Sequence, residues 1–165
     1  MKYIFFSGLI TLIFALFRKK SGAGGQTTSQ SSLSGEIEFK EVLQGLKNSG
    51  YDLTALRFTE KMFRLETGHL TANIYRKTNG AGAIAVKNER PYGFTVLKNN
   101  PDIKTTGTYL SSNGYNYIKF ATLKDGVKFV YEYITNGNMF EQIKRYGGGQ
   151  WYLDRVKTIK PKYTL

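Results

Sequence analysis

Hydrophobic residues recur at helical spacing in the stretch that follows residue 34. Two apolar faces have this spacing: Phe39, Val42, Leu43 and Leu46, and then Ala55, Phe58 and Met62. Steps of three and four residues place side chains on one face of an α-helix. We therefore expect two helices here, the first beginning at Ser34 or Gly35 and the second capped by Asp52.

The pattern changes between residues 83 and 120, where Gly, Pro, Asn and Thr become frequent. The apolar residues there form short pieces at Phe94–Leu97, Thr108–Leu110 and Tyr115–Phe120. The dipeptide Asn113-Gly114 separates the last two pieces, and such a dipeptide between apolar runs is typical of a β-hairpin. We therefore expect a small insert rich in β-hairpin structure.

Helical spacing returns after residue 120. Thr122, a favourable N-cap residue, precedes an apolar face formed by Leu123, Val127, Val130 and Ile134. A short helix is expected over Phe140–Tyr146 and is ended by Gly147-Gly148-Gly149. A last helix before Pro161 carries Tyr152, Val156 and Ile159 on one face. Helices, a β insert and further helices together predict an α+β domain over residues 35–165.

The chain begins with an apolar run, Tyr3–Phe17, between Lys2 and a basic cluster at residues 18–20. The run is shorter than the roughly 20 residues of a typical transmembrane helix. It predicts that residues 1–20 form an N-terminal hydrophobic helix, which is a retained membrane anchor, a cleaved secretory signal or a buried core helix. Residues 21–34 are rich in Ser and Gly and lack periodicity, which is typical of a flexible tether.

The charges beside the apolar run lean toward a cytoplasmic C-terminus. An enzyme that cuts the cell wall needs the opposite side of the membrane. Three localisations therefore stay open: a membrane-anchored domain that faces the periplasm or cell wall, a virion-associated protein, and a protein secreted after cleavage near Ser21-Gly22-Ala23.

Composition narrows the chemistry. The chain has 24 basic and 12 acidic residues and a net charge of +12, so it is drawn to polyanions such as anionic wall polymers, anionic lipids or nucleic acid. The absence of cysteine and the single histidine exclude thiolate nucleophiles, Cys-based zinc sites and His-rich zinc sites. Carboxylates, tyrosines and hydroxyls remain, and neither a metal nor an organic cofactor is expected.

Glu66 is the first candidate for catalysis. It continues the apolar face of the helix that carries Met62, and Gly68 lets the chain leave that helix sharply. A carboxylate on a buried stripe is costly unless it is paired, protonated or active. The negative end of the helix dipole and partial burial both favour its protonated form, which is what a general acid for glycoside cleavage needs.

The segment Glu66-Thr67-Gly68-His69, followed by Asn79, resembles the Glu-Ser-Gly-Trp … Asn signature of bacterial endo-β-N-acetylglucosaminidases. These are the flagellar-muramidase-like enzymes of the lysozyme superfamily. Tyr117–Val127 resembles that family's segment with an aromatic residue, a small residue, an aspartate and a helix. Gln150–Val156 resembles its late aromatic segment. The resemblance departs from the family at Thr67, at His69 and at residues 80–84.

This resemblance implies a lysozyme-like domain whose general acid is Glu66. Asn79 would hold the chain near the acid or touch the N-acetyl group of the sugar, and Tyr152 and Trp151 would line the cleft. Tyr92, in a Pro-Tyr-Gly turn, is a candidate sugar platform. Glu89 is the candidate second carboxylate across the cleft, and Asp102 is a weaker one.

The sequence therefore predicts an enzyme that cleaves peptidoglycan glycan strands, as an endo-β-N-acetylglucosaminidase, a muramidase or a lytic transglycosylase. Its partners would be those strands and, through residues 3–17, a membrane. The alternative is a catalytically silent, basic binding or structural module that grips wall glycan or nucleic acid.

Overall fold

The computed structural model describes residues 27–165 except residue 71, residues 81–90 and residue 113. These residues form helices α2–α8 and a two-stranded antiparallel sheet. The elements are α2 (Thr27–Asn48), α3 (Leu53–Glu66), α4 (Asn73–Thr78), α5 (Pro91–Asn99), β1 (Thr105–Leu110), β2 (Asn116–Phe120), α6 (Leu123–Thr135), α7 (Met139–Gly147) and α8 (Gln150–Thr158). A mostly helical fold with one small sheet confirms the predicted α+β class.

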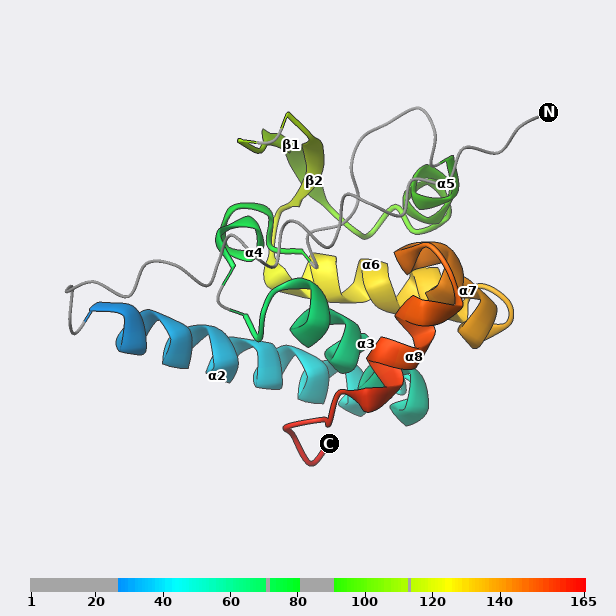
Figure 1. Ribbon diagram of the computed structural model, residues 1–165, viewed down its shortest axis with the longest axis horizontal. Coiled ribbons are helices and arrows are strands. Elements are labelled where there is room, and N and C mark those ends of the chain that lie inside the picture. The colour runs from blue at the N-terminus through cyan, green and yellow to red at the C-terminus, as the bar shows by residue number, and fades with distance from the viewer. Residues whose placement is uncertain (1–26, 71, 81–90, 113) are drawn as a thin grey trace.

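Helix α6 lies at the centre of the fold (Figure 1) and packs against α2, α3, α5, α7 and strand β2. The Thr122 hydroxyl accepts a hydrogen bond from the Asp125 amide at 3.1 Å, and the Asp125 carboxylate accepts one from the Thr122 amide at 3.1 Å. This capping box fixes the first turn of the helix. The apolar face predicted from the sequence is buried, at Leu123, Val127, Val130 and Ile134.

Helix α2 runs along α3 and α6 (Figure 1). Its predicted apolar face is buried at Phe39, Leu43 and Leu46. Asp52 caps α3 as the sequence indicates, because its carboxylate accepts a hydrogen bond from the Ala55 amide at 2.8 Å. The cap sets the start of α3, and the buried Met62 sets the face that it turns to the core.

The predicted β-hairpin is confirmed. Strands β1 and β2 pair antiparallel, with Tyr109 opposite Tyr117, and the turn between them is held by the Ser111 hydroxyl, which donates to the Tyr115 carbonyl at 2.9 Å. Gly114 has a φ of 80°, a conformation that suits glycine. The hairpin packs against α4 and α6.

The rest of the predicted β insert is different. Residues Phe94–Leu97 were expected to form a β segment, and they lie in α5 instead. Pro91 occupies the first helical position, where its missing amide hydrogen costs nothing, and Val96 is buried at helical spacing from Gly93. Tyr92 accordingly lies in the first turn of a helix, not in a Pro-Tyr-Gly turn.

The structure describes only part of the predicted tether and none of the predicted anchor. Residues 27–34 were expected to be flexible, but helix α2 begins at Thr27. Adding turns to an existing helix needs no new nucleus, so a polar segment extends the helix that the Phe39 face anchors. The apolar run Tyr3–Phe17 lies outside the described residues. Over the described residues, no helix has the length and apolar character needed to cross a membrane.

Candidate active site

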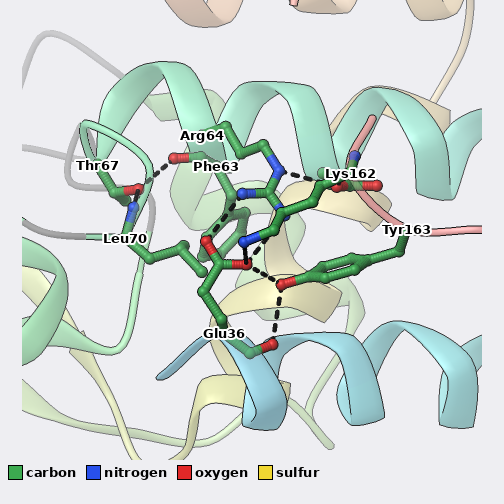
Figure 2. A network of polar contacts seen from close by, with 8 residues as sticks. Glu36, Phe63, Arg64, Thr67, Leu70, Lys162 and Tyr163 are labelled. Atoms are coloured by element: carbon green, nitrogen blue, oxygen red, sulfur yellow. Dashed lines mark hydrogen bonds and ion pairs between the residues drawn. The ribbon is translucent and has the colours of Figure 1, made fainter. Parts of the chain in front are cut away.

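Glu66 is the last residue of α3 and is partly buried. The residues around it are fixed firmly, because Phe63, one turn earlier, is fully buried and so is Thr67. The Thr67 hydroxyl donates to the Phe63 carbonyl and accepts a hydrogen bond from the Leu70 amide at 2.9 Å (Figure 2). The resembled signature has serine at this position. Here the Thr67 hydroxyl holds the chain where it leaves the helix.

The turn after Glu66 has an unusual backbone. Gly68, His69 and Leu70 have φ values of 55°, 60° and 68°, so the chain makes a short left-handed turn. The His69 amide donates to the Arg64 carbonyl at 2.8 Å, and Leu70 is buried with 2 % of its surface exposed. A left-handed conformation costs a non-glycine residue about 1–2 kcal/mol. Strain of this kind persists where the surroundings enforce it, and it concentrates at functional sites.

Tyr152, on α8, lies beside Glu66. Burial raises the pKa of the Tyr152 hydroxyl well above its ordinary value, and the charge of the Glu66 carboxylate raises it further. The charge of the Glu66 carboxylate contributes more to this rise than its hydrogen-bonding contact with the hydroxyl does. The two groups therefore share one environment at the end of α3.

Further tyrosines extend from Tyr152 into the core. The ring centroids of Tyr152 and Tyr146 are 6.2 Å apart, and those of Tyr146 and Tyr133 are 5.1 Å apart at an interplanar angle of 89°. All three side chains are buried. Tyr133 and Tyr146 are neighbours of the site that the sequence does not predict. The only signal for them was their helical spacing from the apolar residues Val130 and Ile143.

The glycines between α7 and α8 make room for this arrangement. A Cβ atom on Gly147 would lie 1.8 Å from the Tyr152 ring, so only glycine allows the ring to pack against the end of α7. Gly148 caps α7 with a φ of 89°, which is a common way to end a helix. The predicted helix stop is confirmed, and its first glycine also serves the packing of Tyr152.

A buried ion-pair network holds the last turn of α3 from the other side (Figure 2). Arg64 has 2 % of its side chain exposed and donates from Nε to Glu60 Oε1 at 2.8 Å. Its other guanidinium nitrogens donate to both oxygens of Glu36 on α2, at 3.0 and 3.2 Å. Burial would raise the pKa of Glu36, but the hydrogen bonds from Arg64 and Tyr163 and the charge of Arg64 lower it to about 2.

The C-terminal segment closes this network. The Lys162 amide donates to Glu60 Oε1 at 2.7 Å, and the Tyr163 hydroxyl donates to the Glu36 carbonyl at 2.8 Å and to its carboxylate. The Arg64 guanidinium also lies 4.8 Å from the centroid of the Tyr163 ring. The two turns of α3 that precede Glu66 are thus bound to α2 and to the end of the chain.

Asn79 contacts neighbouring segments of the chain and does not serve as an open surface residue. Its backbone has a φ of 53° and caps α4, and its side-chain amide donates to the Phe120 carbonyl at 3.2 Å. The Asn79 carbonyl lies so close to α6 that a Cβ atom on Gly126 would be 1.9 Å from its oxygen. Two roles were predicted for Asn79: to hold a turn of the chain, or to touch the N-acetyl group of the sugar. This geometry is that of a residue that holds a turn.

Trp151 and Asp102 make their contacts with other described residues. Trp151 is 50 % exposed and lines an open depression of about 490 Å³ with Asp154, Arg155 and Thr158. Asp102 forms an ion pair with Lys128, whose hydrogen bond lowers the pKa of Asp102. Glu89 lies outside the described residues, and so does the side chain of Tyr92.

In the part of the chain that the structure describes, no group of three or more acidic or histidine side chains is placed to hold a metal ion. Comparison with protein-family models, with curated proteins and with solved structures finds no match.

Proposed function

We propose that the chain is a peptidoglycan-cleaving glycosidase or lytic transglycosylase with a lysozyme-like domain, and that Glu66 is its general acid. The observation that supports this most directly is the pairing of Glu66 with Tyr152 at the end of α3. A partly buried carboxyl group beside a buried hydroxyl, next to a strained turn, is the kind of environment in which catalytic carboxyl groups are found.

In this proposal, protonated Glu66 donates its proton to the glycosidic oxygen between two aminosugars as the bond to the anomeric carbon breaks. The sugar that keeps the anomeric carbon becomes oxocarbenium-like and positively charged. Its charge is then quenched by water or by a hydroxyl of the substrate itself. The Glu66 carboxylate left behind is the base that accepts the O–H proton of that nucleophile.

Tyr152 would contribute as a neutral hydroxyl. Because burial and the charge of Glu66 raise its pKa, the hydroxyl keeps its proton throughout the neutral range. It can therefore donate a hydrogen bond to a carboxylate oxygen of Glu66 after proton transfer. This contact is stronger once Glu66 has become a carboxylate, so it stabilises the transition state more than the ground state, which is the condition for catalysis.

A second carboxylate is not required in this scheme. Asp102 is committed to Lys128, and the described residues offer no other acid in contact with Tyr152. Mechanisms in which the substrate supplies the nucleophile need only the general acid. The proposal keeps Glu89 as a candidate for activating water, and it keeps Trp151 as a sugar-stacking residue because its ring is exposed.

A catalytically silent binding module is the second candidate. Two observations favour it. The side-chain amide of Asn79 donates to backbone carbonyls of the chain itself, and the chain carries a net charge of +12. A basic domain could grip anionic wall polymer or nucleic acid without cutting it.

The test is a zymogram of the full chain on purified peptidoglycan, with Glu66→Gln as the variant and Glu41→Gln, an exposed position on α2, as its control. Glutamine keeps the shape of the side chain but has no carboxyl proton to donate. We expect clearing by the wild type and by the control, and none by Glu66→Gln at an unchanged melting temperature. A wild type that binds the sacculi without cutting them would establish the binding module instead.

A further inference from the structure

Two phenylalanines and two lysines from α3, α7 and α8 form one surface cluster. The ring centroids of Phe58 and Phe140 are 5.6 Å apart at an interplanar angle of 74°. The Lys61 ammonium lies 5.2 Å from the Phe58 ring centroid, and the Lys157 ammonium lies 5.1 Å from that of Phe140. Lys61 also donates to the Lys157 carbonyl at 3.3 Å. We call these four residues the Phe–Lys patch.

One phenylalanine of the Phe–Lys patch is anchored against the core, and the other is exposed. Phe58 is partly buried and packs against the core, whereas Phe140 has 41 % of its surface exposed. The contact with Phe58 therefore supports Phe140 on the side of its ring that is not exposed. A fully apolar ring kept exposed by a rigid support, with a cation beside it, is the form of a side chain that enters an interface.

The charges around the patch are mainly positive. Arg57 is exposed next to Phe58, and Lys160 is exposed just beyond the end of α8. Two acids on the same helices, Glu141 and Asp154, are exposed as well, but Glu141 forms an ion pair with Lys144, so the positive charges remain in excess. A partner that meets this surface must therefore carry negative charge and also accept an apolar ring.

We propose that the Phe–Lys patch docks the domain on the anionic headgroup layer of a lipid bilayer, with Phe140 entering the acyl boundary and Lys157 remaining among the phosphates. Phe and Lys side by side suit that boundary, because one needs apolar contact and the other needs anionic headgroups. This inference goes beyond the proposed glycosidase and does not depend on it.

The geometry favours a bilayer over stacking ligands. Sugars and bases stack on flat ring faces. Here a lysine ammonium lies over a face of each phenyl ring, and the two rings meet edge to face. The ring edges that remain are suited to insertion into an apolar layer, not to stacking. Phenylalanine also has no polar atom with which to read a base or a sugar hydroxyl.

The chain's lack of cysteine permits a direct test with the full-length protein. A cysteine is introduced by Phe140→Cys or, as control, by Leu110→Cys on the hairpin, where the side chain is 63 % exposed. Each is labelled with an environment-sensitive fluorophore and mixed with vesicles of neutral phosphatidylcholine or of phosphatidylcholine with phosphatidylglycerol. We expect a blue shift only for the probe at position 140 and only with the anionic vesicles.

The probe pair separates the patch from the N-terminal apolar run, which would bring both labelled proteins to either vesicle. Equal responses at positions 140 and 110, or no response at 140, would overturn the proposal. In the unlabelled chain, Lys61→Gln with Lys157→Gln should reduce the preference for anionic over neutral vesicles by roughly 30-fold at low salt. Lys104→Gln with Lys119→Gln, exposed near and on the hairpin, should weaken it much less.

Nucleic acid is the rival polyanion. If a DNA duplex binds at the same salt concentration, loses binding in the Lys61 and Lys157 double variant, and no vesicle response is seen at position 140, the surface belongs to nucleic acid and the membrane proposal is wrong.

Discussion

The Tyr152 hydroxyl on α8 lies close to the Glu66 carboxylate at the end of α3, so burial first and then the charge of Glu66 raise the pKa of the tyrosine. Distant parts of the sequence supply the two groups, and α3 and α8 pack directly against each other. The proposed general acid is thereby placed next to a hydroxyl whose raised pKa keeps it protonated. This relationship is the basis of the functional proposal.

Tyr152→Phe tests whether that hydroxyl takes part in the chemistry. Phenylalanine keeps the ring that packs beside Tyr146 and removes only the hydroxyl. The melting temperature should therefore change little. Turnover on peptidoglycan should fall on the order of 10²-fold if the hydroxyl stabilises the transition state.

The matched control is Tyr117→Phe, on the hairpin and away from α8. If Tyr152→Phe and Tyr117→Phe both keep wild-type turnover, Tyr152 serves packing alone. Because the pKa of Tyr152 is raised, its ionisation should not produce a loss of activity between pH 7 and 10 in the wild type.

Local signals were enough to predict most elements. The cap at Asp52, the capping box at Thr122 and the glycine stop after α7 each involve residues only a few positions apart, so the sequence displays them. The spacing around Phe94 was read as strand, whereas Pro91 and the burial of Val96 favour a helix. Short apolar runs are ambiguous between these two structures.

The network around Glu66 could not be predicted in the same way. The bonds from Arg64 to Glu36 and from Tyr163 to Glu36 join residues far apart in the chain. No periodicity encodes such pairs. Tyr152 was singled out through a family resemblance, but its exact neighbours depend on how α7 turns into α8. Asn79 was identified as important, and only the structure shows that its amide holds the end of β2.

Gly147→Ala should disturb the site through the position of Tyr152. The added methyl would lie 1.8 Å from the ring, so the ring or the end of α7 must move. We expect a loss of roughly 1–3 kcal/mol in the free energy of unfolding and a fall in turnover per folded molecule. Denaturant unfolding and peptidoglycan turnover measure the two effects.

Gly148→Ala is the control for Gly147→Ala. Position 148 has open space but a φ of 89°, so alanine there should cost about 1 kcal/mol and leave turnover per folded molecule unchanged. Equal turnover in the two variants would show that the packing of Tyr152 against α7 has no bearing on activity.

The Glu36–Arg64 pair should make the fold sensitive to acid. The pKa of Glu36 is lowered from 4.5 to about 2, so the folded state holds this proton more weakly than the unfolded state. Its contribution to the free energy of unfolding is therefore full above about pH 4.5 and is lost as the pH falls toward 2. Glu36→Gln should lower stability at pH 7 by roughly 1–3 kcal/mol, since Arg64 keeps Glu60 as a partner.

The same variant should show a smaller further loss of stability between pH 4.5 and 2 than the wild type does, as measured by thermal melts across that range. Glu38→Gln, exposed on the same helix, should follow the wild-type curve. A Glu36→Gln curve parallel to the wild type would mean that another carboxyl group causes the acid sensitivity.

Gly126→Ala should break the contact that joins the end of α4 to α6. A Cβ atom at this position would lie 1.9 Å from the Asn79 carbonyl oxygen and 2.9 Å from its carbon. These are backbone atoms that cannot rotate away, so the two elements must separate, at a cost of roughly 1–3 kcal/mol or more.

Gly45→Ala is the matched variant, since it lies exposed in α2 with nothing within 4 Å of the added methyl. It should raise the free energy of unfolding by about 0.5–1 kcal/mol, because alanine is the better helix former. Opposite signs for the two substitutions in urea unfolding would support the close approach of α4 and α6, and stabilisation by both would contradict it.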